Sequence, residues 1–544
     1  MKQLMICLFV LHVTHVCMYA HVPMCAELSL DEKIGQLLMI AVTSCPAEQA
    51  FAARRSAYNV DPEYINQMVR DYHVGGIIFL GAGTPEQQIE RTQQLQALAS
   101  YPLLVGLDAE WGLAMRHKGV ITFPRAMTLG ALCKEDDALI YALGKEVGRQ
   151  CRAIGVHINF APVVDVNNNP GNPIINTRSF GECPESVAHK AALYMKGMQD
   201  AGILTCAKHF PGHGDTQTDS HHARAVIMHD AKRLNAIELA PFKQLIKQGV
   251  DAIMTAHLDV PALSGGKYVP STVSYEVITS LLRHELGFDG LIITDGLGMK
   301  GATAYAAPGR LEVEALKAGN DILLCPVDVP RAVACIKKAL ANGELTEQEI
   351  DAHVERILQA KRAFCSSPQQ GAIKTLHTSD ALQLKQKLYT AAITLYGDTT
   401  LPVIAHNKPL VVCTYGQADV FINALQKGCV VEQYALERDL SQQEQARLQE
   451  ADQLIVSLHL KGRSGMIEVP SEHQTLPCID MINRYADKIT LLLFGSPYNL
   501  SHFPHVKRVI VAYENEPEAQ EGGAETLLGL HVPTGILPVM PSRT

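Results

Sequence analysis

Residues 203–222 read Ile-Leu-Thr-Cys-Ala-Lys-His-Phe-Pro-Gly-His-Gly-Asp-Thr-Gln-Thr-Asp-Ser-His-His. The stretch begins as a short apolar segment and then turns, at a proline and two glycines, into a polar loop. Four histidines, two aspartates and a lysine lie in that loop. In α/β proteins, chemistry is concentrated where a strand runs into a polar, Gly-rich loop. The stretch therefore predicts an α/β fold with a functional site at its strand ends.

Seven more short apolar segments lie between residues 29 and 365. They do not alternate with polar residues, as expected for strands that are buried on both faces of a parallel sheet. Helical patterns separate them; in 184–202, for example, apolar residues recur at helical spacing after Pro184. Eight such units predict a (β/α)8 barrel of the TIM type. The predicted strands are Leu37–Val42, Gly76–Leu80, Leu103–Leu107, His157–Val164, Leu204–Ala207, Ala252–Ala256, Leu291–Thr294 and Ile322–Leu324.

A second, smaller α/β unit is predicted after the barrel. Residues 27–365 form the predicted barrel, 366–385 a linker, and 386–544 a doubly wound α/β sandwich domain. Within the barrel, Ser29 with Glu32 and Thr346 with Glu349 have the spacing of capping boxes, which mark helix starts. The strands predicted for the second domain are Leu410–Thr414, Leu454–Leu458, Ile489–Phe494 and Val509–Tyr513.

Residues 1–26 resemble an export signal with an apolar core from Leu4 to Val13, which is too short to span a bilayer. Cleavage after Ala20 or Ala26 would leave a periplasmic or secreted protein without a membrane span. Cys17 adds a lipoprotein alternative, and an uncleaved anchor or a wrongly assigned start are others.

The net charge of −9, with no run of five basic residues, excludes the basic surface that is typical of nucleic-acid binding. The dispersed cysteines contain no C-x-x-C, so they predict neither a zinc nor a disulfide framework.

Polar residues stand directly beyond the apolar strands. Because the carboxyl ends of barrel strands form the active-site face, these residues are expected to converge. The alternative for any single one is a polar residue satisfied in the barrel mouth. The set comprises Asp108, Asp165, Lys208, His209, His257 and Asp295.

Asp295 ends the strand in Gly-Leu-Ile-Ile-Thr-Asp-Gly-Leu-Gly-Met (290–299), where the glycines allow a ligand to approach closely. It suits a nucleophile, a base or a metal ligand, and the alternative is a helix cap.

Asp219 and His221 have the spacing of an aspartate that stabilises an imidazolium, which predicts a proton donor. A zinc site is the competing interpretation of this loop; its ligands would be His209, His213, His221, His222, Asp215 and Asp219.

These motifs together resemble glycoside hydrolase family 3, in its β-N-acetylglucosaminidase branch. The likeness rests on Lys208-His-Phe-Pro-Gly-His-Gly-Asp-Thr followed by Asp219-Ser-His221, and it extends in order along 29–365. Its other parts are Phe160-Ala-Pro-Val-Val-Asp165, Arg178-Ser-Phe-Gly, Met254-Thr-Ala-His257, Leu282-Arg-His-Glu-Leu-Gly-Phe, Thr294-Asp295 and, near the C-terminus, Gly535-Ile-Leu-Pro-Val539.

The resemblance implies roles for particular residues. Asp295 would form a glycosyl-enzyme intermediate, and His221, paired with Asp219, would act as general acid and then base. No metal or organic cofactor is implied. This chain has Glu-Trp-Gly-Leu at 110–113 where members often have Glu-Gly-Gly-Arg, and Trp111 is expected to line the sugar site or to pack. The residues implied to bind sugar hydroxyls are Asp108, Arg116, Arg178, Lys208 and His209.

The resulting hypothesis is a retaining exo-β-N-acetylglucosaminidase that acts on a carbohydrate substrate, either peptidoglycan fragments or chitin oligosaccharides. One alternative is a different sugar specificity in the same family, such as a β-glucosidase. Another is an N-acetylglucosaminide phosphorylase, because a histidine acid lacks the negative charge that would repel phosphate. The third is a non-catalytic carbohydrate-binding protein.

Overall fold

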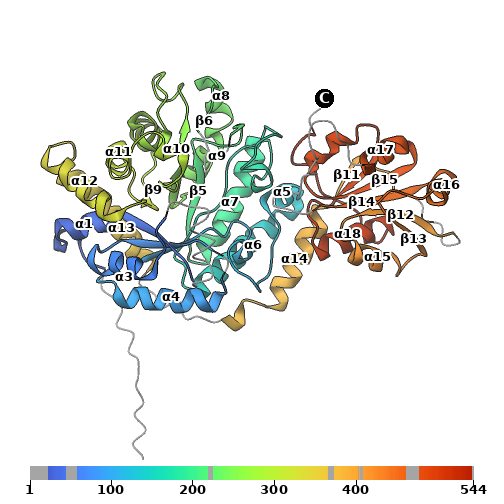
Figure 1. Cartoon of the computed structure of the whole chain (residues 1–544), viewed down its shortest axis with the longest axis horizontal. Coiled ribbons are helices and arrows are strands. Elements are labelled where there is room, and N and C mark those ends of the chain that lie inside the picture. The colour runs from blue at the N-terminus through green and yellow to red at the C-terminus, as the bar shows by residue number, and fades with distance from the viewer. Residues whose placement is uncertain are drawn as a thin grey trace, which may run out of the picture.

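The computed structural model describes residues 22–44, 58–81, 83–218, 224–365, 373–401, 404, 408–460 and 477–541. These residues form two domains that lie side by side, coloured blue to yellow and orange to red (Figure 1). Helix α14 (Ser379–Ala392) leads from the first to the second, so the later part of the segment expected as a linker is helical. No helix in the described ranges is long and apolar enough to cross a bilayer.

Eight parallel strands form a ring in the first domain, in the order β10-β1-β2-β3-β4-β5-β7-β9. A backbone bridge between Ile293 and Ile322 joins β9 to β10. All eight predicted strands are present, so the predicted (β/α)8 barrel is confirmed. The strands are β1 (Leu38–Val42), β2 (Gly76–Phe79), β3 (Leu104–Leu107), β4 (Ile158–Asn159), β5 (Leu204–Phe210), β7 (Ala252–Thr255), β9 (Leu291–Thr294) and β10 (Leu323–Leu324).

Helices follow each barrel strand along the chain. The first and last α-helices described in the barrel, α1 (Leu30–Gln36) and α13 (Glu347–Phe364), begin at the two predicted capping boxes. The others are α3 (Pro62–Asp71) after β1, α4 (Pro85–Leu98) after β2, α5 (Ala126–Gly130) and α6 (Asp137–Ala153) after β3, α7 (Pro184–Asp200) after β4, α8 (Ala231–Ala236) and α9 (Leu239–Lys247) after β5, η6 (Glu276–Glu285) after β7, α10 (Lys300–Thr303) and α11 (Arg310–Ala318) after β9, and α12 (Val329–Ala341) after β10.

Two adjacent strands differ in length from their predictions by more than one residue. Strand β4 is shorter because Pro162 has no N–H to donate to the ladder, although a bridge between Val163 and Lys208 continues the pairing. Strand β5 is longer and runs through Phe210, with a register shift against β7 after Ala207. Lys208 and His209 are therefore strand residues, held more rigidly than the predicted loop would hold them.

The second domain contains a six-stranded sheet in the order β11-β16-β15-β14-β12-β13, parallel except for β11. Ile510 packs with α15 and α18, whereas its neighbours Val509 and Val511 pack on the other face with α16 and α17. Four predicted strands are confirmed, and the edge strands β11 and β13 were missed. The elements are β11 (Thr394–Gly397), β12 (Leu410–Tyr415), α15 (Asp419–Leu425), β13 (Val431–Ala435), α16 (Gln442–Glu450), β14 (Leu454–His459), α17 (Pro477–Arg484), β15 (Ile489–Phe494), β16 (Arg508–Val511) and α18 (Pro517–Leu527).

Candidate active site

Two carboxylates and three cations meet beyond the carboxyl end of β3. Lys208 Nζ lies 2.9 Å from Asp108 Oδ1 and 2.8 Å from Glu110 Oε1, and its side chain is 3% exposed. Arg116 Nη2 donates to Asp108 Oδ2 at 2.6 Å. Arg178 donates to the Glu110 carboxylate through Nε at 2.9 Å and through Nη2 at 2.7 Å. Four residues expected to bind sugar hydroxyls thus form one network with Glu110, which was not among them.

The charges of this network stabilise one another. Burial by itself raises the pKa of the Asp108 and Glu110 carboxyls, but the adjacent cations outweigh it and hold both pKa values well below their usual range. Burial likewise favours the neutral amine of Lys208, but the two carboxylates raise the pKa of Lys208 above its ordinary value. The three groups are therefore charged at neutral pH. Charge-assisted hydrogen bonds are roughly twice as strong as neutral ones, which suits the capture of sugar hydroxyls.

His209 lies beside this network on β5. Its Nδ1 is 2.7 Å from Asp165 Oδ2, and Arg178 Nη2 is 3.3 Å from its Nε2. Because a guanidinium can only donate, Nε2 accepts and Nδ1 carries the proton that is donated to Asp165. Asp165 also accepts hydrogen bonds from the backbone of His209 and of His213. Asp165 therefore orients the imidazole; it stood among the strand-end polar residues but was not singled out for the site.

Asp295 follows β9 directly and is partly buried. Its backbone N–H donates to Thr255 O at 2.9 Å, and the Gly296 N–H donates to its Oδ1 at 2.7 Å. His257 Nε2 is 3.0 Å from Gly296 O, so the imidazole contacts the backbone of the residue that follows Asp295. Asp108 directly follows β3 and Asp295 directly follows β9, so both carboxylates lie at the same end of the parallel barrel.

Tyr58 packs against the loop that follows Asp295. A Cβ atom at Gly298 would lie 2.3 Å from Tyr58 Cε1, and one at Gly296 would lie 2.4 Å from Tyr58 Oη. Burial raises the pKa of Tyr58 well above its ordinary value, and the charge of Asp295 adds to this effect. Tyr58 is therefore a neutral phenol close to the candidate nucleophile. It was not predicted, because it follows no apolar strand.

Asp219 and His221, the expected proton donor and its partner, lie outside the described residues. After them, β6 (Ala225–Val226) pairs with β8 (Leu258–Asp259), the segment that follows β7. Arg224 Nε donates to the Asp259 carboxylate. Residues 224–226, which follow the expected proton donor along the chain, are thus paired with the segment after β7. Strand β7 is the neighbour of β9, which leads to Asp295.

One group of three potential metal ligands occurs in the described part of the chain, formed by Asp215, His229 and Glu238. Arg233 Nη1 donates to both Glu238 oxygens at 2.8 Å, and Arg233 Nη2 lies 3.8 Å from Asp215 Oδ2. The guanidinium therefore already supplies a positive charge to these carboxylates. This group shares Asp215 with the ligands of the zinc alternative.

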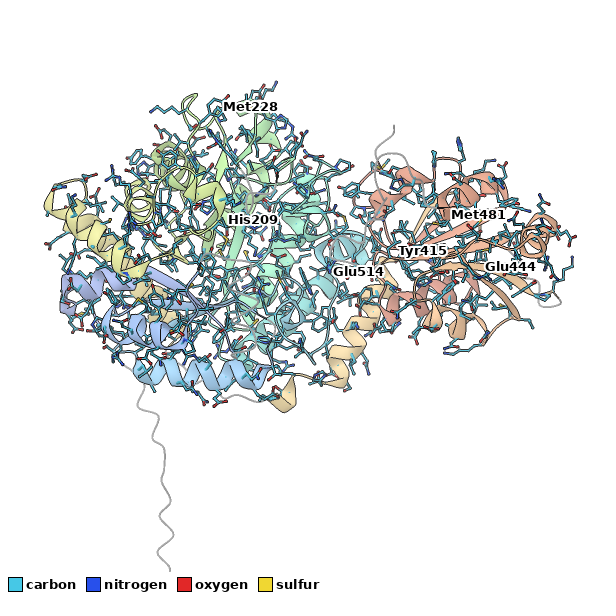
Figure 2. The ribbon with its side chains drawn as sticks, in the orientation of Figure 1. His209, Met228, Tyr415, Glu444, Met481 and Glu514 are labelled. Atoms are coloured by element: carbon cyan, nitrogen blue, oxygen red, sulfur yellow. The ribbon has the colours of Figure 1, made fainter. Side chains whose placement is uncertain are left out.

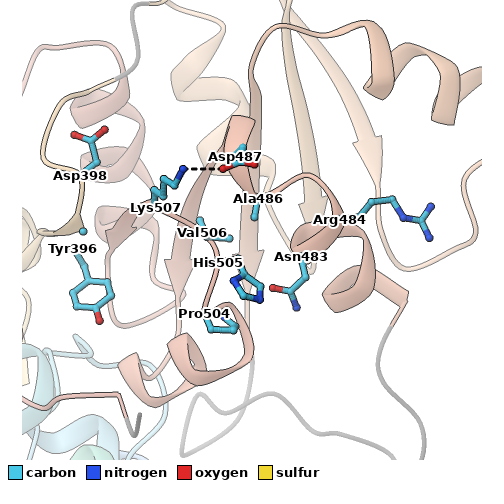
Figure 3. Close-up of a pocket in the computed structure, with 11 residues that line it drawn as sticks. Tyr396, Asp398, Asn483, Arg484, Ala486, Asp487, Pro504, His505, Val506 and Lys507 are labelled. Carbon is cyan, nitrogen blue, oxygen red and sulfur yellow. Dashed lines mark hydrogen bonds and ion pairs between the residues drawn. The ribbon is translucent and has the colours of Figure 1, made fainter. Parts of the chain in front are cut away.

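A separate hollow of about 790 Å³ lies in the second domain (Figure 3). Tyr396, Asn483 and His505 line it, together with the ion pair between Lys507 and Asp487, whose atoms are 2.9 Å apart. The hollow lies beside the amino ends of β15 and β16, whereas parallel sheets bind ligands beyond their carboxyl ends. It contains none of the predicted site residues.

Comparisons with known proteins agree with this geometry. Residues 29–360 match the model of the Glycosyl hydrolase family 3 N terminal domain. The chain is 33% identical over 410 residues to Beta-hexosaminidase A of Pseudoalteromonas piscicida, covering 69% of each protein. It is 26% identical to a Beta-N-acetylglucosaminidase/beta-glucosidase of Cellulomonas fimi, covering 94% of each. Among solved structures, a family 3 beta-N-acetylglucosaminidase from Paenibacillus sp. str. FPU-7 is similar, with 31% identity and a TM-score of 0.76 over 95% of this chain and all of that one.

The matching residues run from α1 into α13, and they include all eight barrel strands, the charged network and Asp295. The Paenibacillus structure also matches the second domain, so the likeness includes both domains. On these grounds the chain belongs to glycosyl hydrolase family 3.

Proposed function

We propose that the protein is a retaining, exo-acting β-N-acetylglucosaminidase. The observation that carries the proposal is the position of Asp295, whose carboxylate is held at the carboxyl end of a barrel strand. The charged network around Glu110 lies at the same end of the barrel, because its Asp108 directly follows the parallel strand β3. A nucleophile beside a set of hydroxyl-binding charges suits attack on a sugar ring. The names of the Pseudoalteromonas and Paenibacillus relatives support N-acetylglucosamine as that sugar.

The proposed reaction has two displacement steps. In the first, an Asp295 oxygen bonds to the anomeric carbon while the bond to the leaving oxygen breaks. His221 gives its proton to that oxygen, and Asp219 stabilises the imidazolium beforehand. In the second step, neutral His221 takes a proton from water, whose oxygen attacks the anomeric carbon and releases Asp295. Two inversions give overall retention, here with an imidazole where most retaining enzymes use a second carboxyl.

Binding of the terminal sugar is assigned to the residues that converge on β3 and β5. The Asp108 carboxylate would accept hydrogen bonds from ring hydroxyls, and the cations around it would donate hydrogen bonds to hydroxyl oxygens. Peptidoglycan fragments and chitin oligosaccharides both present such a terminal residue. The sugar-binding set is Asp108, Arg116, Arg178, Lys208 and His209.

The test is turnover of an aryl β-N-acetylglucosaminide by Asp295→Asn, which keeps the shape of the side chain but removes its nucleophilic charge. The rate should fall on the order of 10³-fold or more, because loss of a covalent nucleophile removes the chemical step itself. Asp289→Asn is the matched control, because Asp289 lies on the same segment but is exposed. Similar rates in the two variants would remove Asp295 from the mechanism.

A second specificity has one observation in its favour, since the name of the Cellulomonas relative also includes beta-glucosidase. Comparison of kcat/KM for aryl β-N-acetylglucosaminide and aryl β-glucoside separates the two specificities. Repeating the assay in phosphate buffer and looking for a sugar 1-phosphate tests the phosphorylase alternative. Release of free sugar at an unchanged rate would favour hydrolysis.

A further inference from the structure

The second domain reaches into the barrel through Tyr498. This residue lies in η9 (Pro497–His502), which follows β15, and it is 2% exposed. Its hydroxyl accepts a hydrogen bond from Asn167 Nδ2 at 2.7 Å and donates one to Asn167 O at 2.9 Å. Asn167 lies in the loop that follows β4 and is fully buried. One hydroxyl of the second domain thus engages both the amide and the backbone of a single barrel residue.

Asn167 in turn holds both ends of the short segment that carries Arg178. Its Oδ1 accepts from Asn176 N at 2.9 Å, and its own backbone N–H donates to Gly181 O at 2.9 Å. Asn176 has a positive φ of 39°, a conformation that needs support from its surroundings in a residue other than glycine. The Asn167 side chain supplies that support two residues before Arg178.

Arg178 in turn contacts residues of the charged network, so its position affects their geometry. Its guanidinium makes the two-pronged contact with Glu110 and a contact with His209. Such paired contacts depend on the direction of the guanidinium plane, so a small shift of the backbone at 176–178 weakens both. A continuous path of hydrogen bonds and backbone therefore runs from Tyr498 through Asn167 and Asn176 to Arg178.

We propose that Tyr498 is a positioning residue, through which the second domain holds Arg178 in its sugar-binding geometry. This inference rests on the proposed function, in which Arg178 binds the sugar. Docking of the domain does not depend on this hydroxyl alone. Glu514 accepts from Arg125 N at 2.9 Å and from the Thr128 hydroxyl at 2.5 Å, and Ile536 N donates to Ala131 O at 2.7 Å.

The test uses Tyr498→Phe in the full chain, which removes the hydroxyl and keeps the ring. Its matched control is Tyr513→Phe. Tyr513 is 3% exposed in the same domain, and its hydroxyl bonds at 2.7 Å to Thr394 of its own domain. Tyr498→Phe loses two buried hydrogen bonds and Tyr513→Phe loses one, so both should lower the thermal stability, Tyr498→Phe by somewhat more. Only Tyr498→Phe should raise KM for the aryl glycoside, by about fivefold, with a smaller change in kcat.

Two further measurements distinguish a positioning role of Tyr498 from a general loss of protein stability. Hydrogen exchange at Asn176 N–H should be faster in Tyr498→Phe than in the wild type and in Tyr513→Phe, and this readout does not require turnover. In an Arg178→Lys background, Tyr498→Phe should have little further effect on kcat/KM, because both changes act on the same contact.

The outcomes distinguish this inference from the proposed function. Wild-type protein that turns over no glycoside would overturn the proposed function, and the exchange rates would still decide whether Tyr498 supports the Arg178 segment. Active wild-type protein, with Tyr498→Phe indistinguishable from Tyr513→Phe in KM and in exchange, would overturn the inference. So would an undiminished effect of Tyr498→Phe in the Arg178→Lys background.

Discussion

Lys208 shows most directly how a single residue combines stability with function. Its ammonium is buried between two carboxylates, and each of the three charges depends on the others because water is excluded. The pKa values of Asp108 and Glu110 are lowered by folding. Their contribution to stability is therefore present above the usual carboxyl pKa of about 4 and is lost as the pH falls below it.

Replacement of Lys208 by methionine should reduce the free energy of unfolding by about 3–5 kcal/mol, because it leaves two carboxylates buried without their shared partner. Urea unfolding at neutral pH measures the loss. Lys507→Met is the matched control: its amine is also 2.9 Å from a carboxylate, but the pair is exposed, so no measurable change is expected. An equal loss in both variants would contradict the role of burial.

At the scale of elements, the loop after β9 depends on the absence of side chains at two positions. Gly296 and Gly298 allow Tyr58 to lie against the loop, while His257 holds the same loop from the β7 side. The loop after Asp295 is thus held by residues that follow β1 and β7 along the chain, as well as by its own strand. A loop held from two sides keeps its catalytic group in one geometry without help from substrate.

Gly298→Ala should lower kcat/KM on the order of 10²-fold, because its Cβ would overlap the Tyr58 ring and displace the loop by a fraction of an ångström or more. Gly428→Ala serves as control, since its Cβ would meet the flexible end of Leu528 in the second domain. Steady-state kinetics with the aryl glycoside compare them. Full activity of Gly298→Ala would show that the position of Tyr58 is unimportant for catalysis.

At the scale of the whole molecule, the carboxyl ends of the second domain's strands face the barrel. Glu514 follows β16 and lies at the junction of the domains, while His209 lies inside the barrel (Figure 2). Burial raises the pKa of Glu514 above its ordinary value. A raised pKa in the folded state means that Glu514 contributes stability that is fully present below about pH 4 and is lost as the pH rises through its folded pKa.

Glu514→Gln should therefore be more stable than the wild type at about pH 7, because it keeps an acceptor for Arg125 and Thr128 without a buried charge. The difference should vanish at about pH 3, which is below the unfolded pKa of about 4.3, because the wild-type side chain is then protonated in both states. Thermal unfolding across this pH range provides the measurement. Lower stability of the variant at neutral pH would show that the charge of Glu514 favours docking.

Much of the architecture was predictable because buried parallel strands leave a strong local pattern. The eight barrel strands and four strands of the second sheet are continuous apolar runs, and the capping boxes are read from two residues each. The edge strands β11 and β13 were missed because their partly exposed residues form no such run. Glu110 was missed as well, although it lies only two residues after Asp108, beyond the same strand, and could have been included for that reason.

Local sequence patterns were enough to predict the succession of strands along the chain and the polar residues that end them. They also predicted that Asp295, Lys208 and His209 lie on one face of a barrel. These follow from periodicity, which is a property of neighbouring residues. The tertiary structure alone decided that Glu110 pairs with Arg178, that Asp165 orients His209, and that Tyr498 reaches Asn167 from the other domain. Each of those contacts joins residues far apart in the chain, and their geometry depends on how whole elements pack, which no local pattern records.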